Sequence, residues 1–321
     1  MTVAEFLSYH QKCLRGTNKH SQDGKTFYAG RPIVHSDSQE SICQQICSAF
    51  DLPQCDNLNK AFLSATRGAG NEWREINQLN SSSLLAFLCF YRVSEENQIE
   101  IRKIKYDKVF FEVKSPLPKI KGFKQPISNM DIVLLNQKTS DILFLESKFT
   151  EYLSSCKPEV SGYYSGFYKN LFSPKFKNFY YDQMNNGRIK WKSESPREPM
   201  YLEGLKQMYC HYLGIQNSVN SCTPSWIKEL LTRKANFRLG TILYKFNRDV
   251  DTKNRFDSYE KLYTQLTSRL TSSKNDAGCI SIENKIITYQ EVFAENNKDF
   301  ALPSLVREFY DLDCKGCDNQ P

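Results

Sequence analysis

The stretch Ser128–Tyr152 sets charged residues beside two short apolar runs, and this combination most constrains what the chain can fold into. The runs Ile132–Leu135 and Ile142–Leu145 are typical of buried strands, and the polar NQKTSD segment between them is typical of a turn. Charged side chains that become buried beside such strands pair with one another or bind a metal ion. The stretch therefore predicts a strand hairpin that carries a polar site near one end.

The turn determines which residues face each other across this hairpin. An even-length turn centred in the NQKTSD segment places Leu135 opposite Ile142. Asp131 then lies opposite Glu146, with Cβ atoms about 4.5–5.5 Å apart. Lys148 follows two residues after Glu146 and points to the same face, about 7 Å along the strand. A bulge in either strand would break this register.

Two carboxylates at this separation repel each other, and a shared proton or a divalent cation relieves the repulsion. Mg²⁺ suits such a site because it binds one or two carboxylates together with water and substrate phosphates. A bound metal would polarise a phosphoryl oxygen, and Lys148 could orient the attacking water or stabilise charge on the phosphate. The residues therefore outline phosphodiester hydrolysis, with Asp131 and Glu146 as metal ligands. The alternative is an ordinary hairpin with a Glu–Lys pair at its solvent end.

The spacing of these residues resembles that of a known nuclease family. Asp131, fourteen intervening residues and then Glu146-Ser147-Lys148 resemble the motif of the PD-(D/E)xK nuclease superfamily. The resemblance implies an α/β restriction-endonuclease-like core of element order αβββαβ, with a mixed four-stranded central sheet flanked by helices. It also implies catalytic roles for Asp131, Glu146 and Lys148, Mg²⁺ as cofactor with Mn²⁺ as a substitute, and DNA as substrate. Met130 stands where the family often has proline.

The other elements of such a core are present in the expected order. The pattern predicts helices over Glu72–Arg92 and Met200–Leu213, and strands over Ile99–Val113 and Phe237–Phe246. The first core helix of the superfamily often supplies an acidic residue, and Glu75 maps to that place. Its alternative role is a favourable interaction with the helix dipole. Glu112 is either a further acidic group near the metal or an ordinary strand-end glutamate.

Three further segments resemble members of the superfamily, whereas one helix motif does not match. The segments REINQLNSSSLLAFLCF, SNMDIVL and FLESKF look similar to bacterial proteins assigned as restriction endonucleases. Some relatives carry a Gln–x3–Tyr motif in the helix after the lysine. Here Gln207 is followed by Tyr209 and Tyr212, so the spacing does not match and that role is not transferred.

Two segments carry residues suited to nucleic acid. Segment 114–126 is rich in lysine, and we expect Lys119, Lys121 and Lys124 to contact the phosphate backbone. The alternative is a solvated surface loop. Segment 163–181 interleaves nine aromatic residues with three lysines, which suits stacking on unpaired bases or packing of an insertion against the sheet. We favour packing.

The 321 residues divide into a core and two extensions. Residues 1–66 form an N-terminal helical extension, with helices over Val3–Leu14 and Ser41–Phe50. We expect residues 67–250 to form the nuclease core that the resemblance implies, with an aromatic and basic insertion at about 157–195. Residues 251–321 form a C-terminal helical extension packed on the core, with helices over Asp257–Leu270 and Leu302–Tyr310. The net charge of +7 favours a polyanionic partner.

Several features predict a cytoplasmic protein without a membrane partner. The sequence has no run of 18 apolar residues, and its first residues lack the pattern of a secretory signal. Most of the eleven cysteines stand singly in apolar surroundings, which favours buried reduced thiols. Cys43, Cys47 and Cys55 with His10 or His20 fit no common zinc motif. With four histidines in all, a histidine-based nuclease is not expected.

These observations predict a metal-dependent endonuclease that acts on DNA, in restriction, phage defence or repair. One alternative is a nucleic-acid-binding scaffold that keeps the fold without catalysis. The intact Asp131, Glu146 and Lys148 argue against it. Another is a nuclease of the same fold that acts on RNA or on a repair intermediate. Many nucleases of this fold cut both strands as homodimers, although nothing in the chain identifies a dimer face.

Overall fold

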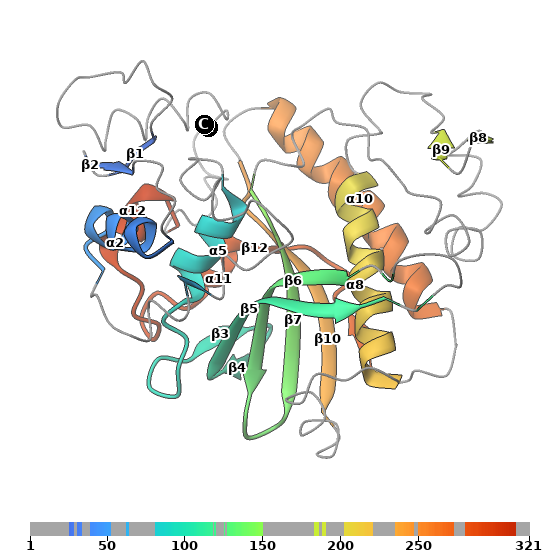
Figure 1. Cartoon of the computed structure of the whole chain (residues 1–321), viewed down its shortest axis with the longest axis horizontal. Helices are drawn as coiled ribbons and strands as arrows, with labels where there is room; N and C mark the ends of the chain where they lie inside the picture. The colour runs from blue at the N-terminus through green and yellow to red at the C-terminus, as the bar shows by residue number, and fades with distance from the viewer. Residues whose placement is uncertain are drawn as a thin grey trace.

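The computed structural model of the chain is organised around one mixed β-sheet (Figure 1). It describes residues 26–28, 31–33, 39–52, 62–63, 81–117, 119, 125, 127–149, 183–185, 188–190, 202–220, 235–246, 250–272 and 280–312. The strands of the sheet are β5 (Lys108–Pro116), β6 (Ile127–Asn136), β7 (Asp141–Lys148), β10 (Asn236–Leu243), β11 (Ile280–Ile282) and β12 (Ile287–Thr288). Their order is β11-β10-β7-β6-β5, and β12 also pairs with β10. The predicted α/β class, a mixed sheet flanked by helices, is confirmed.

The sheet combines an antiparallel half and a parallel half. Strands β5, β6 and β7 form an antiparallel meander, whereas β10 runs parallel to β7, β11 and β12. Helix α8 (Leu202–Asn220) lies between β7 and β10 in the sequence and provides the crossover that a parallel pair needs. The sequence predicts four strands, whereas the sheet has six. β11 and β12 have three and two residues, too few for an alternating pattern to reveal them.

Strands β6 and β7 form the predicted hairpin in the predicted register. Leu135 pairs with Ile142, and the ladder continues to the pair of Ile132 with Leu145. In the turn, the Asn136 side chain accepts hydrogen bonds from two backbone amides at 2.9 Å each. A short polar side chain that bonds the next amides replaces the backbone bonds of a tight turn. The polar segment therefore fixes the register of the apolar strands.

Helices cover both faces of this meander. Successive side chains of a strand point to opposite faces, so Ser147 faces away from its neighbour Glu146. The Ser147 hydroxyl donates to the carbonyl of Ser82 at the start of α5 (Ser82–Phe90), at 3.3 Å. Glu146 contacts His211 of α8. Helices α5 and α8 therefore lie on opposite faces of the sheet.

Helix α5 begins later than the sequence predicts. The Ser81 hydroxyl accepts a hydrogen bond from the Leu84 amide at 3.1 Å, and this cap starts the helix at Ser82. The predicted helix over Glu72–Arg92 therefore does not run through Ser81. Residues 64–80 lie outside the described residues, and Glu75 with them.

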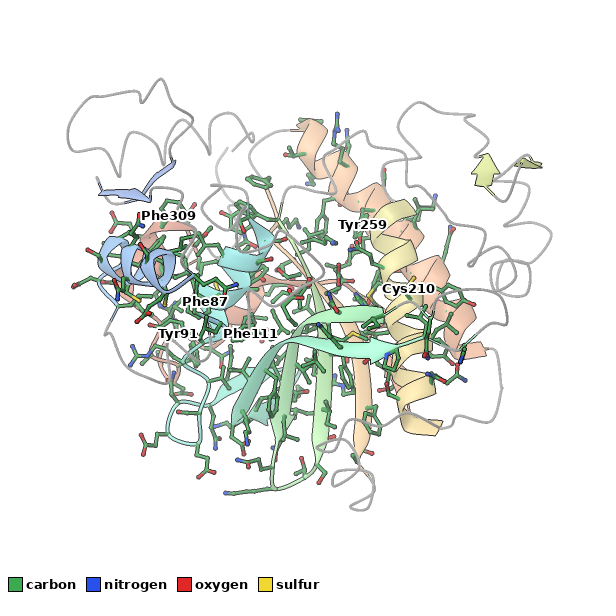
Figure 2. The ribbon with its side chains drawn as sticks, viewed as in Figure 1. Phe87, Tyr91, Phe111, Cys210, Tyr259 and Phe309 are labelled. Atoms are coloured by element: carbon green, nitrogen blue, oxygen red, sulfur yellow. The ribbon has the colours of Figure 1, made fainter. Side chains whose placement is uncertain are left out.

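Helix α5 contributes the side chain of Phe87 to an aromatic core. The ring centroid of Phe87 lies 5.4 Å from that of Phe62. It lies 5.3 Å from that of Tyr91, and Figure 2 labels both Phe87 and Tyr91. It also lies 6.1 Å from Phe111 of β5. Burial of rings of this size dominates the stability of a core. This apolar layer holds β7 from the side opposite to α8.

The remaining described elements lie outside the six-stranded sheet and the helices α5 and α8. They are the helices α2 (Gln39–Ala49), α10 (Val250–Ser272), α11 (Tyr289–Glu295) and α12 (Ser304–Phe309), and the two-stranded pairs β1 (Thr26–Tyr28) with β2 (Arg31–Ile33), β3 (Ile99–Ile101) with β4 (Ile104–Tyr106), and β8 (Gln183–Asn185) with β9 (Arg188–Lys190). The predicted strand region Ile99–Val113 divides into β3, β4 and β5. The first break is a tight turn at Arg102 and Lys103, with φ of 52° and 64°. Among the described residues, no helix is both long and apolar enough to cross a membrane.

Most predicted helices correspond to observed ones. Those predicted over Ser41–Phe50, Met200–Leu213, Asp257–Leu270 and Leu302–Tyr310 correspond to α2, α8, α10 and α12, and α8 and α10 extend beyond the predicted bounds. The predicted helix Val3–Leu14 lies outside the described residues, as does the predicted insertion except for the strands β8 and β9.

Candidate active site

Three carboxylates lie in one row across the sheet, one from each strand of the meander. The register of β6 and β7 places Asp131 opposite Glu146, one step beyond the last paired residues. Glu112 lies between the pairs Phe111–Ile132 and Val113–Met130 of β5 and β6, so it is level with Asp131, although the ladder itself skips both residues. The charges of Glu146 and Glu112 both raise the pKa of Asp131, so the three carboxylates lie close together. We call Glu112, Asp131 and Glu146 the carboxylate row.

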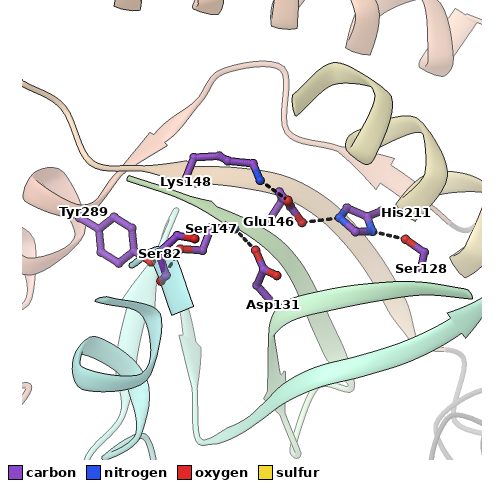
Figure 3. A network of polar contacts seen from close by, with 8 residues as sticks. All are labelled: Ser82, Ser128, Asp131, Glu146, Ser147, Lys148, His211 and Tyr289. Carbon is purple, nitrogen blue, oxygen red and sulfur yellow. Dashed lines mark hydrogen bonds and ion pairs between the residues drawn. The ribbon is translucent and has the colours of Figure 1, made fainter. Parts of the chain in front are cut away.

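Glu146 is held by Lys148 and His211 in a buried position (Figure 3). Lys148 Nζ lies 2.6 Å from its Oε1, and His211 Nε2 bonds its Oε2. Burial alone would raise the pKa of Glu146, but the charges of Lys148 and His211 and their hydrogen bonds lower it to about 2. Glu146 is therefore ionised at neutral pH, and both of its oxygens are engaged.

Asp131 is in the opposite electrostatic situation. Burial raises the pKa of Asp131 well above its ordinary value, and the charges of Glu146 and Glu112 raise it further. Lys148 and the Ser147 amide act against this shift. That amide donates to Oδ2 of Asp131 at 2.7 Å. An excess of negative charge thus gathers at Asp131, where a proton or a cation would be favoured.

The end of β7 that carries this site is fixed on its other face. The Ser147 hydroxyl lies 2.7 Å from the Tyr289 hydroxyl of α11, besides its bond to α5 (Figure 3). Phe149, directly after Lys148, packs edge to face on Tyr244 with ring centroids 4.9 Å apart. These contacts hold the strand while its carboxylate and ammonium face α8.

Glu112 has an unusual backbone for a strand residue. Its φ is 50°, although β5 and β6 remain in register on both sides of it. A side chain other than glycine with positive φ costs on the order of 1–3 kcal/mol, and such residues gather at functional sites. Glu112 is also buried. The structure thus brings this residue, which the sequence left with two alternative roles, beside Asp131.

His211 is the site residue that the sequence reasoning missed. It is buried on α8, and its Nδ1 lies within hydrogen-bonding distance of the Ser128 hydroxyl. The sequence offered one signal for His211, since it stands inside the apolar YCHYL segment of a predicted helix. Its partner Glu146 lies 65 residues away in the sequence, so the pattern alone did not indicate the contact.

The structure brings together only part of the predicted site. Asp131, Glu146 and Lys148 meet as predicted on one face of the hairpin. Lys119 is exposed, and no contact of it with the site is observed among the described residues. Glu75, Lys121 and Lys124 lie outside the described residues, so their predicted roles remain predictions.

The donors near Asp131 suit a hard divalent cation. The carboxylate row offers oxygens, the ligands that Mg²⁺ and Mn²⁺ prefer, and a cation there would relieve the repulsion that raises the pKa of Asp131. No three His, Cys, Asp or Glu side chains among the described residues form a ready metal site. A metal here would thus take part of its ligands from water and substrate.

The chain Ser128–His211–Glu146 also has the order of a hydrogen-bonded relay that activates a serine nucleophile. Two features argue against that use. Ser128 is only 6% exposed, so a substrate would not reach its hydroxyl. Lys148 neutralises the same carboxylate that would stabilise a charged His211. Ser128 and His211 therefore support Glu146 of the carboxylate row and do not form a nucleophile with its base.

The contribution of Asp131 to the stability of the metal-free protein is expected to fall as the pH rises above about 4. In the folded state the pKa of Asp131 lies above its unfolded value near 3.8, so its contribution is complete below that pH and is lost as the pH rises through the folded pKa. Each unit of difference corresponds to about 1.4 kcal/mol. Asp131→Asn removes this loss, so urea denaturation in EDTA should show the variant gaining on the parent as pH rises. A stability gap that does not change with pH would contradict the repulsion.

Glu146 contributes to the pH dependence of stability with a sign opposite to that of Asp131. Its folded pKa of about 2 lies below the unfolded value of 4.5, so its contribution to stability is present above that pH and is lost as the pH falls toward 2. The same denaturation series therefore separates the two carboxylates.

Comparisons with protein-family models, with curated proteins and with solved structures each find no match to this chain.

Proposed function

We propose that this chain is a Mg²⁺-dependent endonuclease that hydrolyses phosphodiester bonds in DNA. The observation that supports it best is the meeting of Asp131, Glu146 and Lys148 on one face of β6 and β7, with Glu112 beside them. With the separate two-stranded pairs β3–β4 and β8–β9 set aside, the element order α5, β5, β6, β7, α8, β10 agrees with the αβββαβ core of the PD-(D/E)xK nucleases. We therefore also propose the restriction-endonuclease-like fold, extended here by β11 and β12.

Each side chain of the site has a role in this proposal. Mg²⁺, when bound, supplies positive charge to a phosphoryl oxygen and lowers the pKa of a water molecule. Asp131 and Glu146 would hold the cation, and Glu112 would add negative charge that favours it. Lys148 is paired with Glu146, and in this proposal its ammonium would donate to the attacking water or to the charge that develops on the phosphate.

Incubation with DNA tests the proposal. The chain should convert supercoiled plasmid to nicked or linear forms in Mg²⁺ or Mn²⁺, and EDTA should abolish the conversion. Methylated and unmethylated plasmids should both be tried, since restriction and phage-defence enzymes differ in what they cut. Lack of cleavage in Mg²⁺, Mn²⁺ and Co²⁺ on varied DNA and RNA substrates would reject the enzyme.

One observation favours a second candidate, a nucleic-acid-binding scaffold without catalysis. Both oxygens of Glu146 are engaged by Lys148 and His211, an arrangement that is satisfied without a metal. A scaffold should bind DNA in Mg²⁺ and in EDTA with equal affinity and leave it intact. Cleavage of RNA in place of DNA would keep the chemistry and change only the substrate. Cleavage that rises with the square of enzyme concentration would support a homodimer.

The lysines of segment 114–126 are expected to contribute to DNA affinity in a salt-dependent way. Each phosphate contact on duplex DNA adds about −0.9 to the slope of log affinity against log salt concentration. Replacing Lys119, Lys121 and Lys124 with glutamine should therefore reduce that slope by up to about 3. A triple variant with the parental slope in a fluorescence-anisotropy titration would remove this segment from the interface.

A further inference from the structure

His211 bridges two strands from the helix that covers them. The residue is 3% exposed, and its two ring nitrogens contact Ser128 of β6 and Glu146 of β7 (Figure 3). A buried imidazole is stable only if its polar atoms are satisfied, and here both are. The ring thus connects α8 to one end of the carboxylate row.

The direction of one hydrogen bond follows from the charge of Glu146. An ionised carboxylate only accepts, so His211 Nε2 carries the proton and donates to Oε2. Hydrogen bonds between a charged and a polar group are the shorter and stronger kind, and they fix the orientation of both partners. The Ser128 hydroxyl then holds the opposite edge of the ring at Nδ1. The ring therefore has one orientation.

Residues other than His211 also dock α8 on the sheet. The Asn217 side chain donates to the carbonyl of Pro116 in β5 at 2.8 Å. At Gly214 the helix lies so close to β5 that an added Cβ would be 2.9 Å from the Cβ of Ser115. The helix is thus fixed to the sheet by other residues, and the bonds of His211 serve the side chains that it touches.

We infer that His211 is a positioning residue that holds Glu146 in the orientation in which it binds a divalent cation, while Ser128 holds the imidazole. This inference rests on the proposed function. Lys148 contacts one oxygen of Glu146, and His211 contacts the other. Without His211, the carboxylate could rotate about its contact with Lys148. Groups that hydrogen-bond to metal ligands orient them, and losing one typically lowers metal affinity by about 10–100-fold.

Two substitutions of His211 separate its two edges. The amide nitrogen of glutamine reaches about as far as Nε2, and that of asparagine about as far as Nδ1. H211Q should therefore keep the donor to Glu146 and retain most of the affinity, whereas H211N and H211A should bind Mn²⁺ about 10–100-fold more weakly. Calorimetric titration of each variant with Mn²⁺, without nucleic acid, measures this directly.

Asn217→Ala provides the matched control, since it removes one bond between α8 and the sheet without touching Glu146. It should lower stability in urea denaturation and leave the Mn²⁺ affinity at the parental value. If H211A does not fold, the comparison of H211Q with H211N carries the test. Equal affinity of H211N, H211Q and parent, or tighter binding by H211N, would overturn the positioning role. A parent whose Mn²⁺ binding is absent, or unaffected by Asp131→Ala, would overturn the metal site itself.

Discussion

Replacing Lys148 with methionine is expected to lower DNA cleavage at saturating Mg²⁺ by about 10²–10³-fold, or roughly 3–4 kcal/mol of transition-state stabilisation. The ammonium of Lys148 lies 2.6 Å from Glu146 and faces the carboxylate row. If it donates to the attacking water or the developing phosphate charge, its loss removes an interaction made mainly in the transition state. DNA affinity in Ca²⁺ should stay near the parental value, because basic residues elsewhere supply most of it. Single-turnover cleavage and anisotropy titration measure the two quantities.

Lys138→Met is the matched control, because Lys138 is an exposed lysine in the turn at the other end of the same hairpin. It should cleave DNA like the parent. Substantial cleavage by Lys148→Met at saturating Mg²⁺ would mean that Lys148 only balances the charge of Glu146. Loss of folding in Lys148→Met would be seen by urea denaturation before any kinetic comparison.

Replacing Asp131 with asparagine is expected to have the largest effect on divalent-cation binding. It removes one negative charge from the centre of the carboxylate row and keeps an oxygen to accept from the Ser147 amide. The Mn²⁺ affinity should fall by more than the roughly 10–100-fold that follows loss of a hydrogen-bond partner of a ligand. The folded state should survive, because the repulsion with Glu146 and Glu112 is relieved. Calorimetric titration with Mn²⁺ measures the change.

Asp141→Asn is the control for this substitution. Asp141 begins β7 at the far end of the hairpin, where it pairs with Asn136 and accepts a hydrogen bond from Asn236 at 3.1 Å. Its replacement should leave the Mn²⁺ affinity unchanged. Equal affinity of Asp131→Asn and the parent would show that the carboxylate row is structural and would withdraw Asp131 from the metal site.

The hairpin at the centre of the site was predictable because its determinants are local. An apolar run, a polar turn and a second apolar run fix the register through side chains only a few residues apart, and Leu135 does pair with Ile142. The charges at the end of the strands then indicate the chemistry. Helix α8 and strand β10 were also predictable from periodicity, because both are long enough to repeat the pattern.

The parts that were not predicted depend on contacts between distant segments. His211 acquires its role from Glu146, which is reached only once α8 packs over the sheet. Glu112 acquires its role from a positive φ in the middle of β5, which no residue type there requires. The strands β11 and β12 are defined by their pairing with β10 and have no pattern of their own.

Whether Asp131 and Glu146 hold a divalent cation is tested most directly by an anomalous difference map from a crystal grown in Mn²⁺. The expected result is a peak between the carboxylates of Asp131 and Glu146, absent from a crystal of Asp131→Asn grown in the same way. A well-ordered site in which Lys148 and His211 still cover Glu146 and no peak lies at the carboxylate row would contradict the proposed metal-dependent nuclease.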